Sequence, residues 1–226
     1  MMKTKILSLL IFFFFSATLA FSQGNIASKT SFAVLGGVNM QNLNGKDNAG
    51  NKLENDMIIG YHAGVNIQLP IAPEFYFQPG LMFATKGAKN TTGSIESSYK
   101  LSYVELPLNL VYKAVVGNGY FMLGFGPYVA YGIGGKAIYE GGAATIESDI
   151  EFKSSLDSGD PLTTVYVKPF DAGANLFFGY ELPSGIFMQL NTQLGLLDIN
   201  PKDDRVPDNE SLLKNTGYGL SLGYRF

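Results

Sequence analysis

Six titratable side chains stand on strand-like segments at positions that alternate with apolar residues. A histidine could act as a general base, and paired carboxylates could divide general acid and general base between them. The only histidine, however, has no cysteine, no second histidine and no nearby serine to work with. The carboxylates have a lysine and an arginine available, which favours ion pairing over catalysis. We therefore expect a polar network on the inner side of a sheet, formed by His62, Glu105, Lys113, Asp171, Glu181 and Arg225.

Other site chemistries find little support in the sequence. The chain contains no cysteine, which excludes disulfide bonds, a thiol nucleophile and thiolate metal sites. Residues 44–51 and 201–210 offer oxygen ligands, but neither segment has the spacing of a calcium-binding loop. No glycine-rich phosphate-binding motif stands between a strand and a helix. We expect no catalytic residue, no cofactor and no metal site, and we interpret the chain as non-enzymatic.

The composition excludes some functions and indicates an unusual surface. The net charge of −3 on 226 residues provides no basic field for nucleic acid, so we expect no nucleic-acid partner. Charged residues make up 15% of the chain, against about 25% in ordinary soluble domains. Glycine (27), phenylalanine (17) and tyrosine (13) are abundant. This balance indicates a surface that water does not cover completely.

The N-terminal residues have the features of an export signal. Lys3 and Lys5 precede an apolar run over residues 6–15, and small residues follow at 18–22. The run is shorter than the roughly 20 apolar residues that a membrane span needs. We expect residues 1–22 to be a signal peptide and residues 23–226 to form one domain. Since no later stretch is long and apolar enough for a membrane helix, a membrane-embedded chain would have to form a closed β-barrel.

Alternation of apolar and polar residues recurs along the whole expected domain. A period of two places apolar side chains on one face of a strand and polar or small side chains on the other. The pattern predicts about eight strands, within residues 31–43, 60–70, 75–86, 103–113, 120–134, 170–182, 186–196 and 218–226. An even number of strands lets the first and last pair and close the sheet.

The connections between these segments fall into two classes that alternate along the chain. Tight turns are expected at residues 70–74, 115–119 and 182–185, whereas long polar connections are expected at 44–56, 86–98, 140–161 and 200–215. Short periplasmic turns and long extracellular loops are typical of outer-membrane barrels. The expected fold is therefore all-β: an eight-stranded antiparallel up-and-down transmembrane β-barrel. Residues 164–167 within the longest connection could extend a strand above the membrane.

Periodicity alone does not decide which face of the barrel points inward. A soluble lipocalin-like carrier is the main alternative, because its apolar residues line a ligand cavity. Two observations favour an apolar outer face: the charged residues share the other face with Gly, Asn and Gln, and tyrosines end the apolar faces as in the aromatic girdles of membrane barrels. Three prolines within the strands, Pro79, Pro107 and Pro127, are interpreted as sites of β-bulges.

Several segments together resemble a known family. Residues 103–113 (YVELPLNLVYK), 121–133 (FMLGFGPYVAYGI), 170–182 (FDAGANLFFGYEL) and the terminal LGYRF are similar to the outer-membrane β-barrel domain of the PorT-like family of Bacteroidetes-type bacteria. Residues 60–70 and 77–87 fit the same pattern. The resemblance implies a location in the cell outer membrane of a Gram-negative bacterium, and it implies no catalytic residue. Phe226 resembles the C-terminal aromatic residue by which the barrel-assembly machinery recognises its clients.

The expected function is a structural or surface-interaction role through the extracellular loops. The expected partners are outer-membrane lipid, the barrel-assembly machinery during biogenesis and an unidentified extracellular partner, and we expect a monomer. Two alternatives stay open beside the soluble carrier. One is a binding or passage barrel for small apolar compounds, suggested by Met82, Met122, Tyr128 and Phe177 on the inner faces, and the other is a lipid-modifying barrel enzyme.

Overall fold

The computed structural model describes residues 29–226 except 143, 204 and 207–209. The expected signal peptide, residues 1–22, lies outside the described residues. Within the described part of the chain, no helix is long and apolar enough to cross a membrane.

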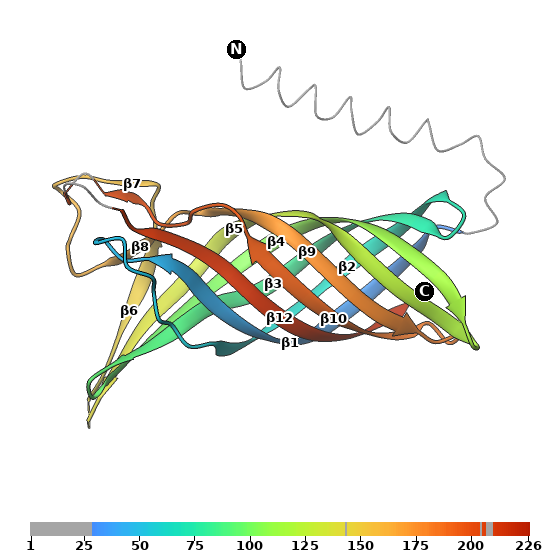
Figure 1. Ribbon diagram of the computed structural model, residues 1–226, viewed down its shortest axis with the longest axis horizontal. Coiled ribbons are helices and arrows are strands. Elements are labelled where there is room, and N and C mark those ends of the chain that lie inside the picture. Colours follow the sequence, from blue (N-terminus) through green and yellow to red (C-terminus); the bar gives the residue numbers. More distant parts are fainter. Residues whose placement is uncertain (1–28, 143, 204, 207–209) are drawn as a thin grey trace, which may run out of the picture.

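Eight long strands form a closed antiparallel barrel (Figure 1). Each strand pairs with the next along the ring, and the ring closes where the first long strand pairs with the last. The eight are β1 (Ser31–Lys46), β2 (Ile58–Ala72), β3 (Phe75–Thr92), β4 (Ile95–Val116), β5 (Gly119–Gly141), β9 (Phe170–Glu181), β10 (Ile186–Gly195) and β12 (Leu212–Arg225). The expected eight-stranded up-and-down topology is confirmed.

The strand registers determine how strongly the barrel is staggered. Following paired neighbours once around the ring leads from Ala33 to Leu43 of the same strand, a stagger of about ten residues. Such a stagger tilts the strands by about 40° to the barrel axis and leaves an interior that side chains can fill. We call the end with the tight turns the turn end and the opposite end the loop end.

The apolar face of the barrel points outward. Along β10, Met188, Leu190 and Leu194 are 46–56% exposed, whereas Phe187 and Gln189 between and beside them are buried. The same alternation holds on β12, where Leu222 is exposed and Ser221 is buried. A soluble protein with so many exposed apolar residues on every strand would aggregate, whereas lipid covers such a surface at no cost. The outward apolar face contradicts the soluble lipocalin-like alternative.

Aromatic residues frame the apolar surface at two levels. On β9, Phe170 and Tyr180 are separated by about ten residues, which at about 3.3 Å per residue and a tilt of about 40° corresponds to about 25 Å along the axis. This is the height of the apolar band of outer-membrane barrels. Ring pairs form the bands: Tyr61–Phe83 and Tyr131–Phe170 towards the loop end, Phe75–Tyr112 and Tyr224–Phe226 at the turn end.

The expected loop at residues 86–98 is instead a long hairpin. β3 runs on to Thr92 and β4 begins at Ile95, so only Gly93 and Ser94 form the turn. Gly93 has a φ of 62°, a conformation that glycine adopts at no steric cost. The segment is polar because both of its faces lie outside the membrane, and polarity alone made it look like a loop.

The longest connection also contains more structure than its composition suggests. β5 continues to Gly141 and turns back into β6 (Ala144–Phe152), which pairs with β5 in antiparallel fashion. The expected strand segment within residues 164–167 is present as β8 (Val165–Val167), parallel to β6. Two further short strands, β7 (Ser155–Leu156) and β11 (Lys202–Asp203), pair at the loop end.

The interpretation of the three strand prolines as bulge sites is wrong. The register of β3 on β4 is the same before and after Pro79, and that of β4 on β5 is the same on both sides of Pro107. Pro127 pairs with Ala174 without a shift. The shifts lie instead between Pro70 and Ala72 and at Ser102/Tyr103. A missing proline donor removes one ladder bond, which neighbouring pairs tolerate without inserting a residue.

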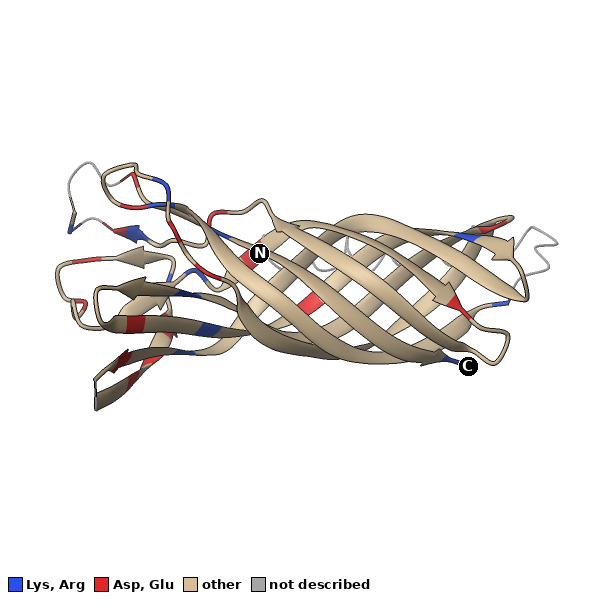
Figure 2. Ribbon diagram, turned by 60° about the horizontal axis from the view of Figure 1, so that its bottom comes forward, with Lys and Arg blue, Asp and Glu red and all other residues tan. Residues whose placement is uncertain are grey.

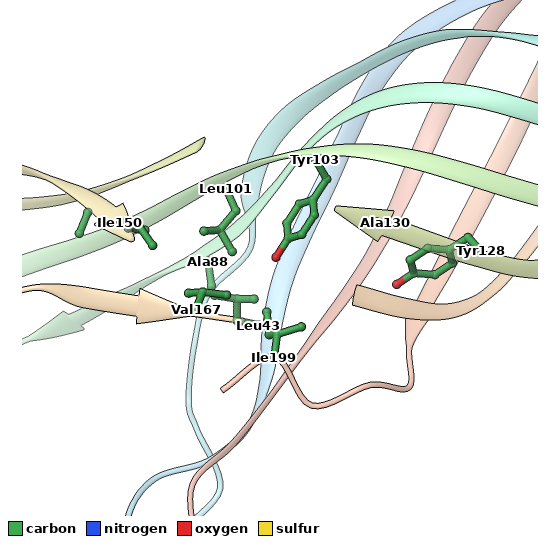
Figure 3. Packing of buried hydrophobic residues seen from close by; sticks show 10 residues of the cluster. Leu43, Ala88, Leu101, Tyr103, Tyr128, Ala130, Ile150, Val167 and Ile199 are labelled. Carbon is green, nitrogen blue, oxygen red and sulfur yellow. The ribbon is translucent and has the colours of Figure 1, made fainter. Parts of the chain in front are cut away.

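An apolar cluster caps the barrel at the loop end. Its side chains come both from barrel strands, such as Leu43, Leu101 and Tyr103, and from the connections, such as Val167 and Ile199 (Figure 3). All five are buried. The connections therefore fold down over the barrel mouth and close it with a small hydrophobic core.

A charge placed in the apolar band tests the orientation of the faces. Replacing the outward Leu176 (Leu176→Arg) should lower the free energy of unfolding in lipid vesicles by about 2–4 kcal/mol, because a guanidinium near the bilayer midplane loses its hydration. The matched control is Leu162→Arg at the loop end, where the side chain is 82% exposed, and its effect should stay within about 0.5 kcal/mol. Urea titration followed by fluorescence measures both, and equal effects would contradict an outward apolar band.

Candidate functional site

The interior of the barrel holds a buried ion cluster near the loop end. The ammonium group of Lys86 lies 2.6 Å from Glu105 Oε1 and 2.9 Å from Asp171 Oδ2. Tyr128 Oη and Asn215 Nδ2 donate to the same Asp171 oxygen, at 3.1 and 2.9 Å. We call these five residues the loop-end cluster. One cation thus serves two carboxylates, and two neutral donors add hydrogen bonds to Asp171 Oδ2, whereas Asp171 Oδ1 has no hydrogen-bond partner in the described structure.

A second ion cluster closes the turn end. The Glu181 carboxylate receives Lys113 Nζ on one oxygen at 2.7 Å and Arg225 Nε on the other at 2.9 Å. Arg225 also donates to Asn66 Oδ1 at 3.2 Å. The Lys113 ammonium lies 4.9 Å from the centre of the Tyr120 ring, a distance that suits a cation–π contact. We call Lys113, Glu181 and Arg225 the turn-end cluster.

Strand register brings the two acids of the loop-end cluster close to each other. Glu105 pairs across β4 and β5 with Ala130, which itself pairs with Asp171 on β9. The small alanine between the two acids leaves room for Lys86 to reach both. Each charge in the two clusters has an opposite charge within hydrogen-bonding distance, as burial of ions inside a barrel requires.

Between the clusters lies a cavity of about 110 Å³. Nine amide side chains stand in its walls beside apolar residues, and three of them, Asn39, Gln41 and Asn109, each have a buried carbonyl oxygen without a hydrogen-bond partner in the described structure. A cavity of this volume and polarity has room for several water molecules, which would satisfy those oxygens. The other amides around it are Asn66, Gln78, Asn175, Gln189, Asn191 and Gln193.

His62 lies on the wall of this cavity, and the sequence-based expectation that it lacks a serine is wrong. Its Nε2 lies 2.7 Å from Ser221 Oγ, which also accepts a hydrogen bond from Asn191 Nδ2 at 2.8 Å. His62 and Ser221 are far apart in the sequence, so the spacing of residues along the chain could not reveal their contact. No carboxylate is hydrogen-bonded to the imidazole among the described residues, so the third member that orients a catalytic histidine is missing there.

The structure places all six expected network residues inside the barrel, but in three separate places. Glu105 and Asp171 join the loop-end cluster, Lys113, Glu181 and Arg225 form the turn-end cluster, and His62 faces the cavity. Sequence reasoning missed Lys86, because it was placed at the start of an expected loop. The alternation through Ala84, Lys86 and Ala88, all buried, was the signal that could have found it.

Charged contacts also tie the connections to one another at the loop end. Arg205 holds Asp203 through Nε and Nη2, both at 2.8 Å, and donates through Nη1 to the carbonyl oxygen of Asp160 at 2.9 Å. The hydrogen bond from Arg205 is the main cause that lowers the pKa of Asp203 below its usual value. Lys153 likewise lowers the pKa of Asp160 by hydrogen bonding. Within the described residues, no group of three His, Asp or Glu side chains could hold a metal ion.

A known protein family matches most of this chain. A family model described as the outer membrane protein beta-barrel domain matches residues 21–200. The chain belongs to this family. As a member of the outer membrane protein beta-barrel domain family, it is a transmembrane protein of the cell outer membrane, and the apolar band is the surface that meets lipid. No curated protein matches the chain.

Solved structures that match this chain include those of Ail and NspA. The crystal structure of the attachment invasion locus protein Ail of Yersinia pestis has 10% sequence identity and a TM-score of 0.38, and the match covers 88% of this chain and 100% of that one. Neisserial surface protein A (NspA) has 12% identity and a TM-score of 0.41, with 88% of this chain and 98% of that chain covered.

Removing the single cation of the loop-end cluster tests its role in stability. Lys86→Met leaves Glu105 and Asp171 buried without a counter-charge, so the free energy of unfolding should fall by about 3–5 kcal/mol. Adding Glu105→Gln and Asp171→Asn to that variant should recover part of the loss. Urea titration in vesicles measures all forms.

The matched control is Lys136→Met on the exposed part of β5. Lys136 forms an ion pair with Glu147 at 3.0 Å, but half or more of each side chain's surface is exposed. Its loss should change stability by about 0.5 kcal/mol or less. Equal effects of the two lysine substitutions would show that the buried cluster adds no more to stability than a surface pair.

Proposed function

We propose that the protein is a non-enzymatic outer-membrane barrel of the PorT-like type that presents its extracellular hairpins and loops to an external partner. The observation that carries the proposal is the closed interior: ion clusters block both ends of the lumen, and an apolar cap covers the extracellular mouth. A barrel that is filled in this way acts as an anchor for what projects from it.

The projecting part is large and ordered for a barrel of this size. The β3–β4 hairpin and the β5–β6 hairpin continue the barrel wall into a sheet beyond the aromatic band, and Ile95 near one tip pairs with Gly141 near the other. Figure 2 shows that charged residues of both signs gather in these hairpins and connections, while the membrane-spanning part carries few charges. Acidic residues outnumber basic ones in the β5–β6 hairpin. Rigid elements with a distinct charge present a defined surface to a partner.

The alternatives fit the interior less well. An apolar ligand would leave the amide groups of the cavity without hydrogen bonds, which is costly in a closed site. A lipid-modifying enzyme needs its reactive groups at the membrane surface, whereas Ser221 is 1% exposed and, like His62, lies on the inner side of the wall. We also propose that the protein is a monomer, because the ring of eight described strands has no unpaired edge within the membrane.

Single cysteines provide a direct test, since the natural chain has none. Ser94→Cys places a thiol at the tip of the β3–β4 hairpin, and Asn118→Cys places one in the tight turn at the other end. Intact cells should incorporate a membrane-impermeant maleimide into the Ser94→Cys variant only, because the hairpin tips are outside the cell. A photo-crosslinker attached at position 94 should capture a discrete partner.

Two results would contradict the proposal. One is labelling of the Asn118→Cys variant and not of the Ser94→Cys variant in intact cells. The other is steady single-channel conductance of the wild-type protein in planar bilayers, because it would show that the interior is a passage and not a filled support.

We propose that Phe226 is the assembly signal read by the barrel-assembly machinery. Its ring is 73% exposed at the turn end and packs edge-on against Tyr224 at 4.9 Å, while its N–H donates to Phe32 O. An exposed ring can be recognised without disturbing the fold. Phe226→Ala should therefore reduce the amount of protein in the outer-membrane fraction several-fold but leave spontaneous refolding into vesicles unchanged.

Phe32→Ala is the matched control, since Phe32 is an exposed aromatic residue at the same end of the barrel. It should leave the amount in the outer membrane near the wild-type value. Loss of refolding in vesicles for Phe226→Ala would show a structural role, and an unchanged amount in cells would disprove a signal role.

A further inference from the structure

The outermost strand of the extracellular sheet has an edge that no other described strand covers. β6 pairs with β5 over Ala144–Asp149 on one side. On its other side, β8 pairs only with Ile150–Phe152. Among the described residues, no further backbone hydrogen bond reaches residues 144–149. Backbone groups on such an edge are free to pair with an incoming strand.

The two faces of β6 differ in chemistry. Glu147, Asp149 and Glu151 alternate along one face, and all three are exposed. Only Glu147 has an ion pair within the described structure, with Lys136. Three carboxylates at alternate positions repeat about every 6.6 Å, which is the spacing of side chains on one face of a neighbouring strand.

The other face of β6 is apolar and only partly covered. Ile150, next to β8, is buried, whereas Ile146, beyond the end of β8, is 65% exposed. On the adjacent strands the apolar face continues with Tyr139, which packs edge-on against Tyr99 at 6.3 Å. The apolar face of β6 is therefore covered beside β8 and exposed beyond it, at Ile146.

Among the residues that the structure describes, none completes this edge. If β8 were longer, residues 161–164 would have to pair with β6. The preceding residue, Asp160, is held in place, because its carboxylate binds Lys153 and its carbonyl oxygen accepts a hydrogen bond from Arg205. A second copy of the chain is also unsuitable. Two β6 edges side by side would bring their carboxylates together, and like charges on paired strands are destabilising.

From the open edge, the carboxylate row and the uncovered apolar face, we propose that β6 is a docking edge for an extended basic peptide segment. The segment adds a strand along Ala144–Asp149, with Lys or Arg side chains opposite Glu147 and Asp149 and small apolar side chains against Ile146. Glu151, which pairs with Tyr166 of β8, adds its negative charge just beyond the end of the added strand. This inference rests on the proposed function, because it specifies the chemistry of the external partner.

The test uses a fluorescent, terminally blocked peptide of sequence Lys-Thr-Lys-Val-Lys-Thr-Lys and its counterpart with Glu in place of Lys. Binding to the full-length protein in zwitterionic detergent micelles is measured by fluorescence anisotropy, with empty micelles subtracted. The wild type should bind the lysine peptide at least about ten-fold more tightly than the glutamate peptide. The variant Asp149→Lys/Glu151→Lys should reverse this preference.

A matched variant separates the β6 edge from the general negative charge of the loops. Glu54→Lys/Asp56→Lys changes the net charge by the same amount on another connection, where both side chains are exposed, and it should retain the wild-type preference. A lysine peptide that is N-methylated at alternate backbone positions should bind at least about ten-fold more weakly, because it lacks donors for the edge.

Equal losses in the two charge-reversed variants, or equal binding of the N-methylated peptide, would overturn the docking edge. Neither result would affect the surface role proposed above, which the labelling and crosslinking at residue 94 test independently.

Discussion

The wall of a membrane barrel is one strand thick, so each side chain faces either lipid or the lumen. In nearly every two consecutive residues of a strand, the apolar residue faces lipid. The polar and charged side chains therefore face the narrow interior. Charges there lose their hydration and need partners at hydrogen-bonding distance. The two ion clusters are the consequence: Lys86 serves two acids near the loop end, and Glu181 serves two cations at the turn end.

The filled interior determines what the rest of the structure can do. With both ends of the lumen closed, we propose that the barrel serves as a base for the external part, in which the four strands β3 to β6 continue the barrel wall beyond the membrane. The apolar cap joins this sheet to the connections around Val167 and Ile199, so the external surface is held in one arrangement. The free edge of β6 is the place where that sheet stops without a covering strand.

Alternation and the sorting of connections were sufficient to predict the barrel, because both are local patterns that recur along the chain. The outward apolar face was predicted from the charged residues on the opposite face and from the tyrosines that end the apolar faces, and the location from the export signal and the family resemblance. The hairpin over residues 86–98 was not predictable in this way, since its residues lack the alternation of apolar and polar side chains that marks the membrane-spanning strands. Missing that hairpin also concealed Lys86, the cation on which the loop-end cluster depends. The contact between His62 and Ser221 depends on strands that meet only when the ring closes.

The most direct test of the account is electrophoretic mobility of the outer-membrane fraction with and without boiling. A closed barrel with a lipid-facing apolar band resists unfolding by detergent at room temperature, so the unboiled protein should migrate differently from the boiled one. Recovery of the protein as a detergent-free soluble monomer, with one mobility before and after boiling, would contradict a lipid-facing barrel.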